Sequence, residues 1–432
     1  MQIILLSGGS GKRLWPLSNE IRAKQFIKIF SAENGRESMV QRVLRQIRET
    51  LSAPVTISTS RIQKKILRKY VGAGVEISVE PCRRNTFPAI ALTAAYLRDV
   101  QKISLEEPLV ICPVDPYVED EYFTAFEEMA ALAGTSNLVL MGIAPTYPSE
   151  KYGYILPETK EKVSGVLEFK EKPDAATAQK YIDAGGLWNG GVFACKLSYV
   201  LEKSRELLGA ASYSELLENY SALPDISFDY AVVEHEKNIK VIRYGGAWKD
   251  LGTWNTFTEV MDTAAIGDVQ LDGTCQNSHV VNETDMPIIA LGLKNIVVAA
   301  SPDGILIADK HQSSYLKPLA ENIHRQIHFA EKSWGTYKVI DVGDESLTIK
   351  VTLTAGNKMR YHSHNFRREV WTIISGSGRV VLDGEIKTVA VGDVVEIPVG
   401  AKHTLIAETN LKAIEVQMGR DISVEDKILW ED

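Results

Sequence analysis

The chain has 432 residues, which is too long for one ordinary hydrophobic core and predicts two or three domains. Hydrophobic residues make up 45% and charged residues 24%, as is usual for soluble globular proteins. The formal net charge of −8 argues against nucleic acid as a partner, although it leaves room for a local basic pocket for nucleotide phosphates.

The cysteines and the N-terminus indicate the compartment. Four cysteines, at positions 82, 112, 195 and 275, are far apart and show no CxxC spacing. The sequence therefore predicts neither a disulfide framework nor a zinc knuckle. We see no signal peptide, and no apolar run is long enough to span a bilayer. We expect a cytoplasmic protein with no membrane partner.

The first expected element is a buried parallel strand at residues 3–6, IILL, followed by a glycine-rich loop. Glycines let the backbone turn tightly and bring its N–H groups close to a ligand, and nearby cations suit a phosphate. The residues concerned are Gly8, Gly9, Gly11, Lys12, Arg13 and Lys24. The spacing is neither that of a Walker A loop nor that of the dinucleotide fingerprint. On the glycines alone, a plain strand-to-loop turn stays open.

The longer string LSGGSGKRLWPLS, followed by KQF at residues 24–26, closely resembles the signature of sugar-1-phosphate nucleotidyltransferases. It is similar in particular to bacterial mannose-1-phosphate guanylyltransferases. The resemblance implies that the loop wraps a nucleoside triphosphate and that Arg13 and Lys24 are catalytic, neutralising phosphate charge. The nucleotide-binding residues that it implies here are Leu6, Gly8, Gly9, Gly11 and Lys12.

The next elements indicate the fold of the first domain. Residues 38–50 carry apolar positions at helical spacing, and residues 55–58 have the pattern of a strand. Such segments alternate to about residue 260, which predicts an α/β domain with a mostly parallel, Rossmann-like sheet. In such folds ligands bind at the carboxyl ends of strands, where the glycine-rich loop falls.

The string EPCRRNTFPAIAL, residues 80–92, predicts a helix from Ala89. Arg84 and Asn85 precede it, where free N–H groups gather. A capped helix with solvated arginines is the plain alternative. The string resembles the second nucleotide-contacting segment of the same family, which implies that Arg84 and Asn85 bind base, ribose or phosphate.

Two strand-end aspartates are candidate ligands for Mg²⁺, which prefers carboxylate oxygens together with substrate phosphates. Asp115 ends the run LVICPVD, and Asp250 lies in WKDLGTW, downstream of SFDYAV. A turn aspartate is the plain alternative for each. The family resemblance implies that Asp115 and Asp250 converge on one Mg²⁺ as catalytic residues. Pro116 stands where the family commonly has histidine, so it carries no role.

Three later segments match the sugar-binding half of the family, in order: MGIAPTYPSEKYGYI, EFKEKP and LWNGGVF. Taken singly, each is a turn with polar residues. Together they imply that Gly153 allows close backbone approach and that Lys172 lies near the sugar phosphate. They also imply that Glu171 and Asn189 bind sugar hydroxyls.

From residue 262 to about 325, short β-rich pieces alternate with turns and show no convincing internal repeat. From Trp334, strand-like runs between Gly and Asp turns predict a small β-barrel. The resemblance gives a nucleotidyltransferase domain at residues 1–262, a β-rich linker domain at 263–328 and a cupin domain at 329–432.

The C-terminal module matches both motifs of a cupin. Three imidazoles and one carboxylate are suited to Zn²⁺ or another divalent transition metal. These residues are His362, His364, Glu369 and His403. An empty cupin kept for assembly is the alternative.

In bifunctional relatives this module is a phosphomannose isomerase, but the chain departs from their pattern. His362 replaces a glutamine, Val370 replaces a histidine, and Thr404 replaces an arginine suited to a substrate phosphate. Isomerase activity therefore stays an open alternative.

The expected function is guanylyl transfer from GTP to mannose 1-phosphate, which gives GDP-mannose for polysaccharide biosynthesis and releases pyrophosphate. The alternatives are another nucleotide such as CTP, another hexose 1-phosphate, a bifunctional enzyme, and a non-catalytic sugar-nucleotide sensor. We expect a homo-oligomer, with a dimer as its expected size.

Overall fold

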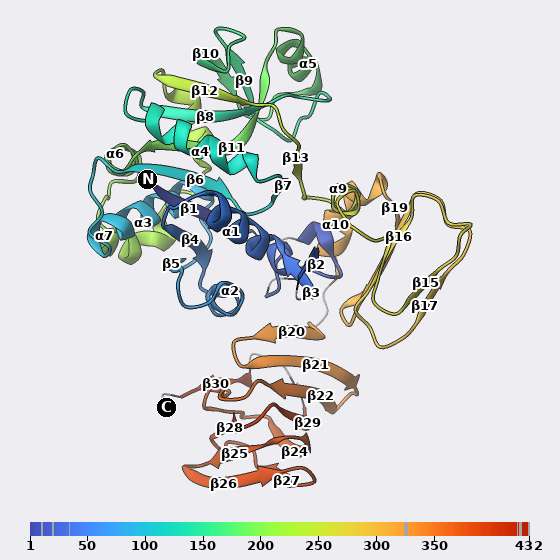
Figure 1. Ribbon diagram of the computed structural model, residues 1–432. Coiled ribbons are helices and arrows are strands. Elements are labelled where there is room, and N and C mark those ends of the chain that lie inside the picture. Colours follow the sequence, from blue (N-terminus) through green and yellow to red (C-terminus); the bar gives the residue numbers. More distant parts are fainter. Residues whose placement is uncertain are drawn as a thin grey trace. The chain divides into compact units, whose positions relative to one another are not determined.

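The computed structural model describes residues 1–9, 12–19, 21–33, 35–323, 327–420, 422 and 426–430 (Figure 1). The chain forms two compact units. One comprises Met1–Gly11 and Ala23–Asp262, and the other comprises Lys12–Arg22 and Thr263–Asp432. The finer division into three domains stays a prediction.

A nine-stranded mixed sheet forms the centre of the first unit, in the order β5-β4-β1-β6-β11-β8-β12-β10-β9. Four neighbouring strands run parallel: β5 (Glu76–Glu80), β4 (Val55–Ser60), β1 (Gln2–Ser7) and β6 (Pro108–Pro113). The others are β11 (Leu187–Lys196), β8 (Leu138–Ile143), β12 (Ile239–Tyr244), β10 (Val163–Lys170) and β9 (Tyr154–Pro157). Among these, only β8 and β12 pair in parallel.

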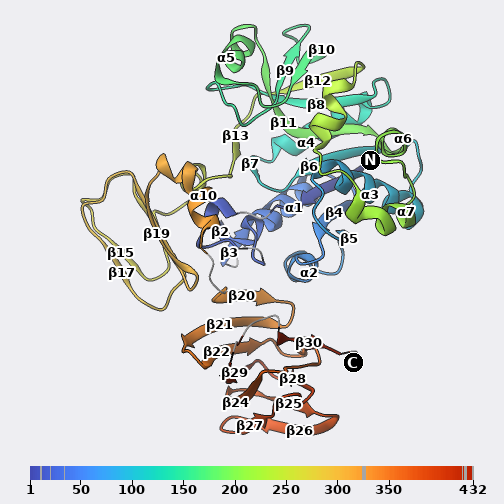
Figure 2. The same ribbon diagram turned by 180° about the vertical axis from the view of Figure 1, so that it is seen from behind.

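Helices cover both faces of this sheet, as the strand β1 illustrates (Figure 1, and from behind in Figure 2). Ile3 and Leu5 belong to one buried cluster and Ile4 to the other. The first cluster includes α1 (Met39–Thr50), α2 (Lys64–Val71), α4 (Glu121–Leu132) and α5 (Ala175–Asp183). The second includes α3 (Thr86–Asp99), α6 (Leu197–Leu208), α7 (Tyr213–Asn219) and α8 (Phe228–Ala231). A strand buried on both faces gives an unbroken apolar run, which is why IILL identified β1. The predicted α/β class is confirmed.

The helix expected over residues 38–50 is confirmed as α1, with Ser38 as N-cap and Gln41 completing a capping box. The helix expected from Ala89 begins earlier, at Thr86. Asn85 accepts the Thr86 N–H at 2.9 Å and so caps the helix. Pro88 fits inside the first turn, because N–H groups there have no partner within the helix.

After Thr263, the second unit continues with short strands that pair mainly in parallel; we call these strands rungs. β14 (Ala265–Ile266), β16 (His279–Asn282) and β18 (Ile296–Ser301) pair in parallel, as do β15 (Val269–Leu271) and β17 (Ile288–Ala290). β19 (Gly304–Asp309) pairs antiparallel with β18. The sequence analysis expected β-rich pieces here but not their parallel pairing. Parallel backbone pairing needs only small apolar residues inside, such as Val280, Ala290 and Val298, and these leave a weak sequence signal.

Residues Lys12–Arg22 pack within this second unit. Ser301 Oγ donates to the carbonyl of Pro16 at 2.8 Å, and Arg22 donates two hydrogen bonds to Glu283, at 2.5 and 3.0 Å.

Shorter elements of the chain are β2 (Lys28–Ala32), β3 (Gly35–Ser38), β7 (Pro116–Val118), β13 (Trp248–Asp250), α9 (Trp254–Thr258) and α10 (Leu316–Glu321).

Two antiparallel sheets form the C-terminal barrel. One contains β20 (Phe329–Lys332), β21 (Gly335–Val342), β22 (Ser346–Leu353), β29 (Leu411–Gly419), β24 (Arg367–Ser375) and β27 (Val394–Ile397). The other contains β26 (Glu385–Ala390), β25 (Ser377–Leu382), β28 (His403–Ala407), β23 (His362–Ser363) and β30 (Ile428–Leu429). Trp371, Ile373 and Leu405 are buried in its core. The predicted cupin fold is confirmed.

Within the described ranges, no helix has the length and apolar character needed to cross a bilayer.

Candidate active site

The loop after β1 is anchored by buried side chains that the sequence analysis did not single out. Gln63 Nε2 donates to the Gly9 carbonyl at 3.1 Å, and Gln25 Nε2 donates to the Ser7 carbonyl at 3.2 Å. Gln25 also donates to Gln63 Oε1 at 3.2 Å, and Thr59 Oγ1 donates to the Ser7 carbonyl at 3.0 Å. These bonds go to the carbonyl groups of Ser7 and Gly9 and not to their N–H groups, which suits a loop that binds an anion through backbone N–H groups.

The structure places the predicted loop residues in different parts of the chain. Leu6, Gly8 and Gly9 lie at the carboxyl end of β1, where the Leu6 carbonyl accepts the Val114 N–H at 3.3 Å. Gly11 lies outside the described residues, as does the side chain of Lys12. Arg13 is exposed in the 3₁₀ turn Lys12–Leu14 and belongs to the second unit. The roles of all these residues stay predictions.

Asp115 and Asp250 meet at the ammonium group of Lys24. Lys24 Nζ lies 2.7 Å from Asp115 Oδ2 and 3.9 Å from Asp250 Oδ1. The pairing of β7 with β13 explains the convergence, because Asp250 lies directly opposite Pro116. The two aspartates are about one-third exposed, at 32% and 34%, so a ligand can reach them. The structure therefore brings together three predicted catalytic residues from distant parts of the chain.

These groups fit a magnesium ion by their chemistry. The two carboxylates supply hard oxygen ligands, and the remaining ligands can come from substrate phosphates and water. Gly252 leaves room for Asp250, since a Cβ at position 252 would lie 3.2 Å from both its carboxylate oxygens. The assignment of Asp115 and Asp250 as ligands stays a prediction.

Glu80, at the carboxyl end of β5, is a further candidate that the sequence analysis missed. Its carboxylate is buried, accepts a hydrogen bond from Tyr220 Oη at 2.9 Å, and lies 3.2 Å from where a Cβ on Gly8 would stand. Burial raises the pKa of Glu80 to about 7, although the Tyr220 hydrogen bond and the charge of Arg83 act in the opposite direction. Glutamate is ordinary at a strand end, so only its burial beside the loop identifies it.

The second predicted nucleotide segment, which contains Arg84 and Asn85, begins helix α3. Asn85 caps α3 and has a backbone φ of 66°, a left-handed conformation uncommon for residues other than glycine. The Arg84 guanidinium donates to the carbonyl of Ser221. The capped-helix interpretation therefore holds, and contacts of Arg84 and Asn85 with a nucleotide stay predictions.

The four predicted sugar-phosphate residues lie together. A Cβ on Gly153 would stand 2.5 Å from Glu171 Oε2 and 3.3 Å from Asn189 Cβ, so a larger residue there would displace the Glu171 carboxylate. The Asn189 N–H donates to the Gly153 carbonyl at 2.8 Å, and Lys172 pairs with Glu171. The close approach at Gly153 is thus made by the Glu171 carboxylate.

An aromatic group extends from the sugar residues to the aspartates. Trp188, next to Asn189 in β11, contacts Tyr152 with ring centroids 5.0 Å apart, and Tyr152 contacts Trp248 in β13 at 5.5 Å. Burial and then the negative charge of Asp250 raise the pKa of Tyr152. Trp254 is fully buried and packs against Phe257. Both groups of predicted residues therefore belong to one region of the first unit.

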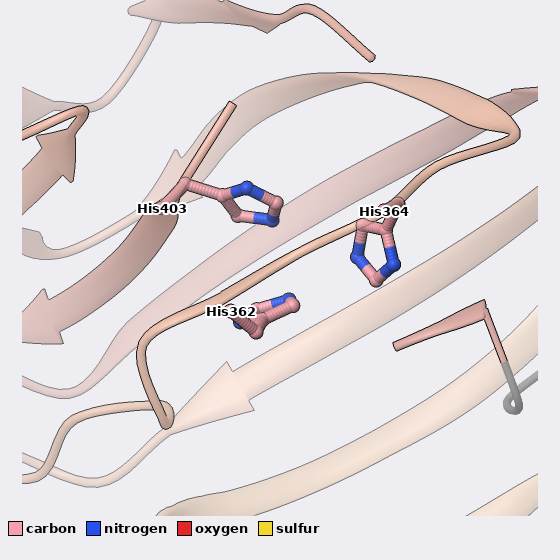
Figure 3. A group of neighbouring side chains, drawn as sticks. All are labelled: His362, His364 and His403. Carbon is pink, nitrogen blue, oxygen red and sulfur yellow. The ribbon is translucent and has the colours of Figure 1, made fainter. Parts of the chain in front are cut away.

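The cupin brings its three histidines together (Figure 3). Their ligand nitrogens lie within 4.8 Å of one another, and His362 on β23 pairs directly with His403 on β28. Each Nδ1 faces a backbone carbonyl: Arg360 at 2.7 Å, Ala401 at 2.9 Å and Asp426 at 2.9 Å. These contacts direct each Nε2 lone pair inward, which is the arrangement expected of metal-binding imidazoles.

Glu369 completes the predicted set. Its carboxylate lies 3.0 Å from His364 Nε2 and 3.4 Å from His403 Nε2. Burial opposes ionisation of Glu369, but the adjacent His364 and His403 hold its pKa well below the usual range. Burial and then the charge of Lys427 lower the pKa of His362 to about 2, so that imidazole is neutral. Arg367 donates toward His364 Nε2 at 3.2 Å. The cluster can hold a divalent metal, and its chemistry does not specify which one.

Known sequences and structures match both units. The profile described as nucleotidyl transferase matches residues 2–265, and the profile described as mannose-6-phosphate isomerase C-terminal matches residues 319–432. The mannose-1-phosphate guanylyltransferase of Salmonella montevideo is 30% identical, over 99% of this chain and 98% of that protein. The xanthan biosynthesis protein XanB of Xanthomonas campestris strain B100 is 31% identical, over 99% of this chain and 98% of that protein.

A solved structure is also similar to this chain. The crystal structure described as mannose-1-phosphate geranyltransferase from Thermus thermophilus has a TM-score of 0.63 and 29% identity to this chain. The match covers 75% of this chain and 99% of that one.

Proposed function

This chain belongs to the nucleotidyl transferase family, and on that premise we propose that it transfers a guanylyl group from GTP to mannose 1-phosphate. A phosphate oxygen of the sugar phosphate bonds to the α-phosphorus of GTP. The bond from that phosphorus to the pyrophosphate oxygen breaks, so GDP-mannose and pyrophosphate are the products. The reaction needs no covalent enzyme intermediate.

One observation carries the proposal: Asp115, Asp250 and Lys24 meet within hydrogen-bond or ion-pair distance, in the same unit as the glycine loop and the Glu171–Asn189 group. The Lys24 ammonium supplies positive charge for the triphosphate. The backbone N–H groups at Gly8 and Gly9 add oriented donors, and the anchors Gln25 and Gln63 hold them ready before the ligand binds.

Asp115 and Asp250 are the residues that would hold magnesium. When bound there, the ion withdraws charge from phosphate oxygens and favours attack at phosphorus. Glu171 and Asn189 would bind sugar hydroxyls, while Lys172 balances the negative charge of the sugar phosphate.

Glu80 supports the choice of guanine. An ionised carboxylate accepts two hydrogen bonds side by side, and guanine presents an N1–H and an N2 amino group as adjacent donors. Cytosine offers one amino group on its pairing edge, next to acceptors. A buried carboxylate beside Gly8 therefore suits guanine better than cytosine.

The test is pyrophosphate release from a panel of nucleotides and hexose 1-phosphates with Mg²⁺. We expect turnover that needs both GTP and mannose 1-phosphate. Strong turnover with CTP, or with another hexose 1-phosphate in place of mannose 1-phosphate, would overturn the substrate assignment. Binding of GDP-mannose without pyrophosphate release would instead support the sensor alternative.

In the cupin we propose a bound Zn²⁺ or another divalent transition metal, supported by the three inward-facing imidazoles. The proposal also includes a cytoplasmic location, supported by four free cysteine thiols. We also propose that the chain forms a homodimer, and sedimentation analysis would test this.

A further inference from the structure

The string SFDYAVVE, residues 227–234, lies upstream of Asp250 and contains none of the candidate site residues predicted from the sequence. It forms α8 and the 3₁₀ turn η4 (Val233–His235). Its start is fixed to the α/β core. The Phe228 N–H donates to Thr86 Oγ1 at 2.9 Å, and the buried Phe228 ring contacts Phe193 with centroids 5.1 Å apart.

Asp229 holds the side chain of Asn189. Asn189 Nδ2 donates to Asp229 Oδ1 at 2.7 Å, and Asn189 Oδ1 accepts the Gly191 N–H at 3.1 Å. Asp229 Oδ1 accepts from Asn189 Nδ2, and the Gly191 N–H can only donate, so together they fix which way the amide faces. The second N–H and the second lone pair of the Asn189 amide therefore point in directions set by these two contacts.

Two further residues of the segment contact the neighbouring candidates. Glu234 Oε1 accepts the backbone N–H of Glu171 at 3.0 Å, which holds the turn after β10. The ring of Tyr230 lies under Lys172 Nζ, 5.8 Å from its centroid. Lys172 has a backbone φ of 45°, a left-handed conformation that needs support from its surroundings. Each of three segment residues therefore contacts a different candidate residue.

We propose that residues 228–234 are the positioning element of the sugar-phosphate site, and that Asp229 fixes the Asn189 amide in the orientation that selects the hexose 1-phosphate. This inference rests on the proposed function, because it takes the Glu171–Asn189 group to be the sugar site. Hydrogen bonds held in fixed directions discriminate well between sugars that differ only in the placement of one hydroxyl.

The test compares Asp229→Ala with Asp229→Asn. Alanine removes the acceptor for Asn189, whereas asparagine keeps an acceptor oxygen without the charge. Burial and then the charge of Glu171 raise the pKa of Asp229 to about 7, so a neutral amide resembles the native group closely. Asp225→Asn, an exposed aspartate of the same loop, is the matched control. The KM for each substrate and kcat are measured in the full chain, with melting temperatures to confirm folding.

For Asp229→Ala we expect the KM for mannose 1-phosphate to rise at least about tenfold and the preference over glucose 1-phosphate to fall, with the KM for GTP within about twofold of wild type. Asp229→Asn should restore the KM to within about threefold, because the amide oxygen still accepts the hydrogen bond. Glu234→Ala and Glu234→Gln should show the same contrast.

An unchanged KM for mannose 1-phosphate in Asp229→Ala would overturn the inference, as would equal losses for both substrates or identical behaviour of the alanine and asparagine variants. Failure of the proposed function gives a different result: the wild-type chain itself would form no nucleotide sugar. In that case, direct titration of mannose 1-phosphate into wild type and Asp229→Ala decides the inference. Equal affinities would reject it, and weaker binding by the variant would sustain it.

Discussion

At the scale of single residues, Lys24 is the group whose charge the proposed site needs most. Its ammonium stands between two carboxylates in the structure and would face a triphosphate in the reaction. We expect Lys24→Met to lower kcat/KM for GTP by about 100-fold or more, as removal of other oriented charge-stabilising groups does. The measurement is steady-state pyrophosphate release.

Lys64→Met is the matched control for that variant, because Lys64 is exposed on α2 in the same unit. It should keep wild-type rates. If Lys24→Met retained more than about a third of the wild-type kcat/KM, Lys24 would have no important part in stabilising charge at this site.

Glu80 leads to a prediction about pH. Its pKa is raised to about 7 in the folded chain, above the ordinary value of 4.5. The folded state therefore binds this proton more tightly than the unfolded state does. The resulting stability is fully present below about pH 4.5 and is lost as the pH rises through 7. Glu80→Gln keeps an acceptor for Tyr220. Because glutamine does not titrate, the stability of this variant does not fall with pH through this group.

We therefore expect the free energy of unfolding of Glu80→Gln, relative to wild type, to increase between pH 5 and pH 8, while its preference for GTP weakens. Urea unfolding at several pH values measures the first effect, and the nucleotide panel measures the second. A stability difference that is independent of pH would show that Glu80 does not titrate in this range.

At the scale of elements, the anchoring of the glycine loop depends on one buried amide group. Gln63 donates to the Gly9 carbonyl and accepts from Gln25. Gln63→Leu would leave both of those groups without this partner. We expect it to lower the free energy of unfolding by about 1–3 kcal/mol and to raise the KM for GTP, because the loop would lose its fixed shape.

Gln179→Leu, on the exposed face of α5, controls for loss of a surface glutamine. Urea unfolding and nucleotide kinetics are measured on both variants. A Gln63→Leu protein with lower stability but an unchanged KM for GTP would show that the anchor serves the fold alone.

The elements also show what the sequence could predict. The run IILL and the capping residues Ser38 and Gln41 act locally, so their patterns identify β1 and α1 directly. The group of Gln25, Thr59 and Gln63 could not be found in this way. Each is an ordinary polar residue, and its importance comes from burial beside a loop that lies elsewhere in the sequence.

The candidate site likewise has features that the sequence could predict and features that it could not. Asp115 and Asp250 could be proposed only because each stands in a string resembling one family, since spacing alone says nothing about residues so far apart. Their convergence depends on the β7–β13 pairing, which lies outside local sequence patterns. Asp229 and Glu234 were missed because they act through other residues, Asp229 on the Asn189 side chain and Glu234 on the backbone N–H of Glu171.

At the scale of the whole molecule, the cupin cluster leads to a prediction about metal. A metal that binds only the folded state raises stability by about 2.7 kcal/mol when its free concentration is 100 times its Kd. We expect Zn²⁺ to raise the melting temperature of the wild-type chain. His403→Ala should lose this shift and keep its guanylyl-transfer rate.

His311→Ala is the control, because His311 is exposed and is not part of the histidine cluster. It should keep the full response to Zn²⁺. The same Zn²⁺ shift in His403→Ala would place the binding elsewhere. A loss of guanylyl transfer in His403→Ala would show that the cupin is needed for the chemistry of the first unit.

The most direct test of the account is a double-mutant cycle on Asp115→Asn and Asp250→Asn, followed by single-turnover formation of GDP-mannose. If both carboxylates act on one ion, each single variant should lose about 100-fold or more in rate, and the double variant should be little worse than the poorer single one. Asp183→Asn, exposed in the same unit, should react at the wild-type rate. Full activity in either single variant, or losses that multiply in the double variant, would contradict the account.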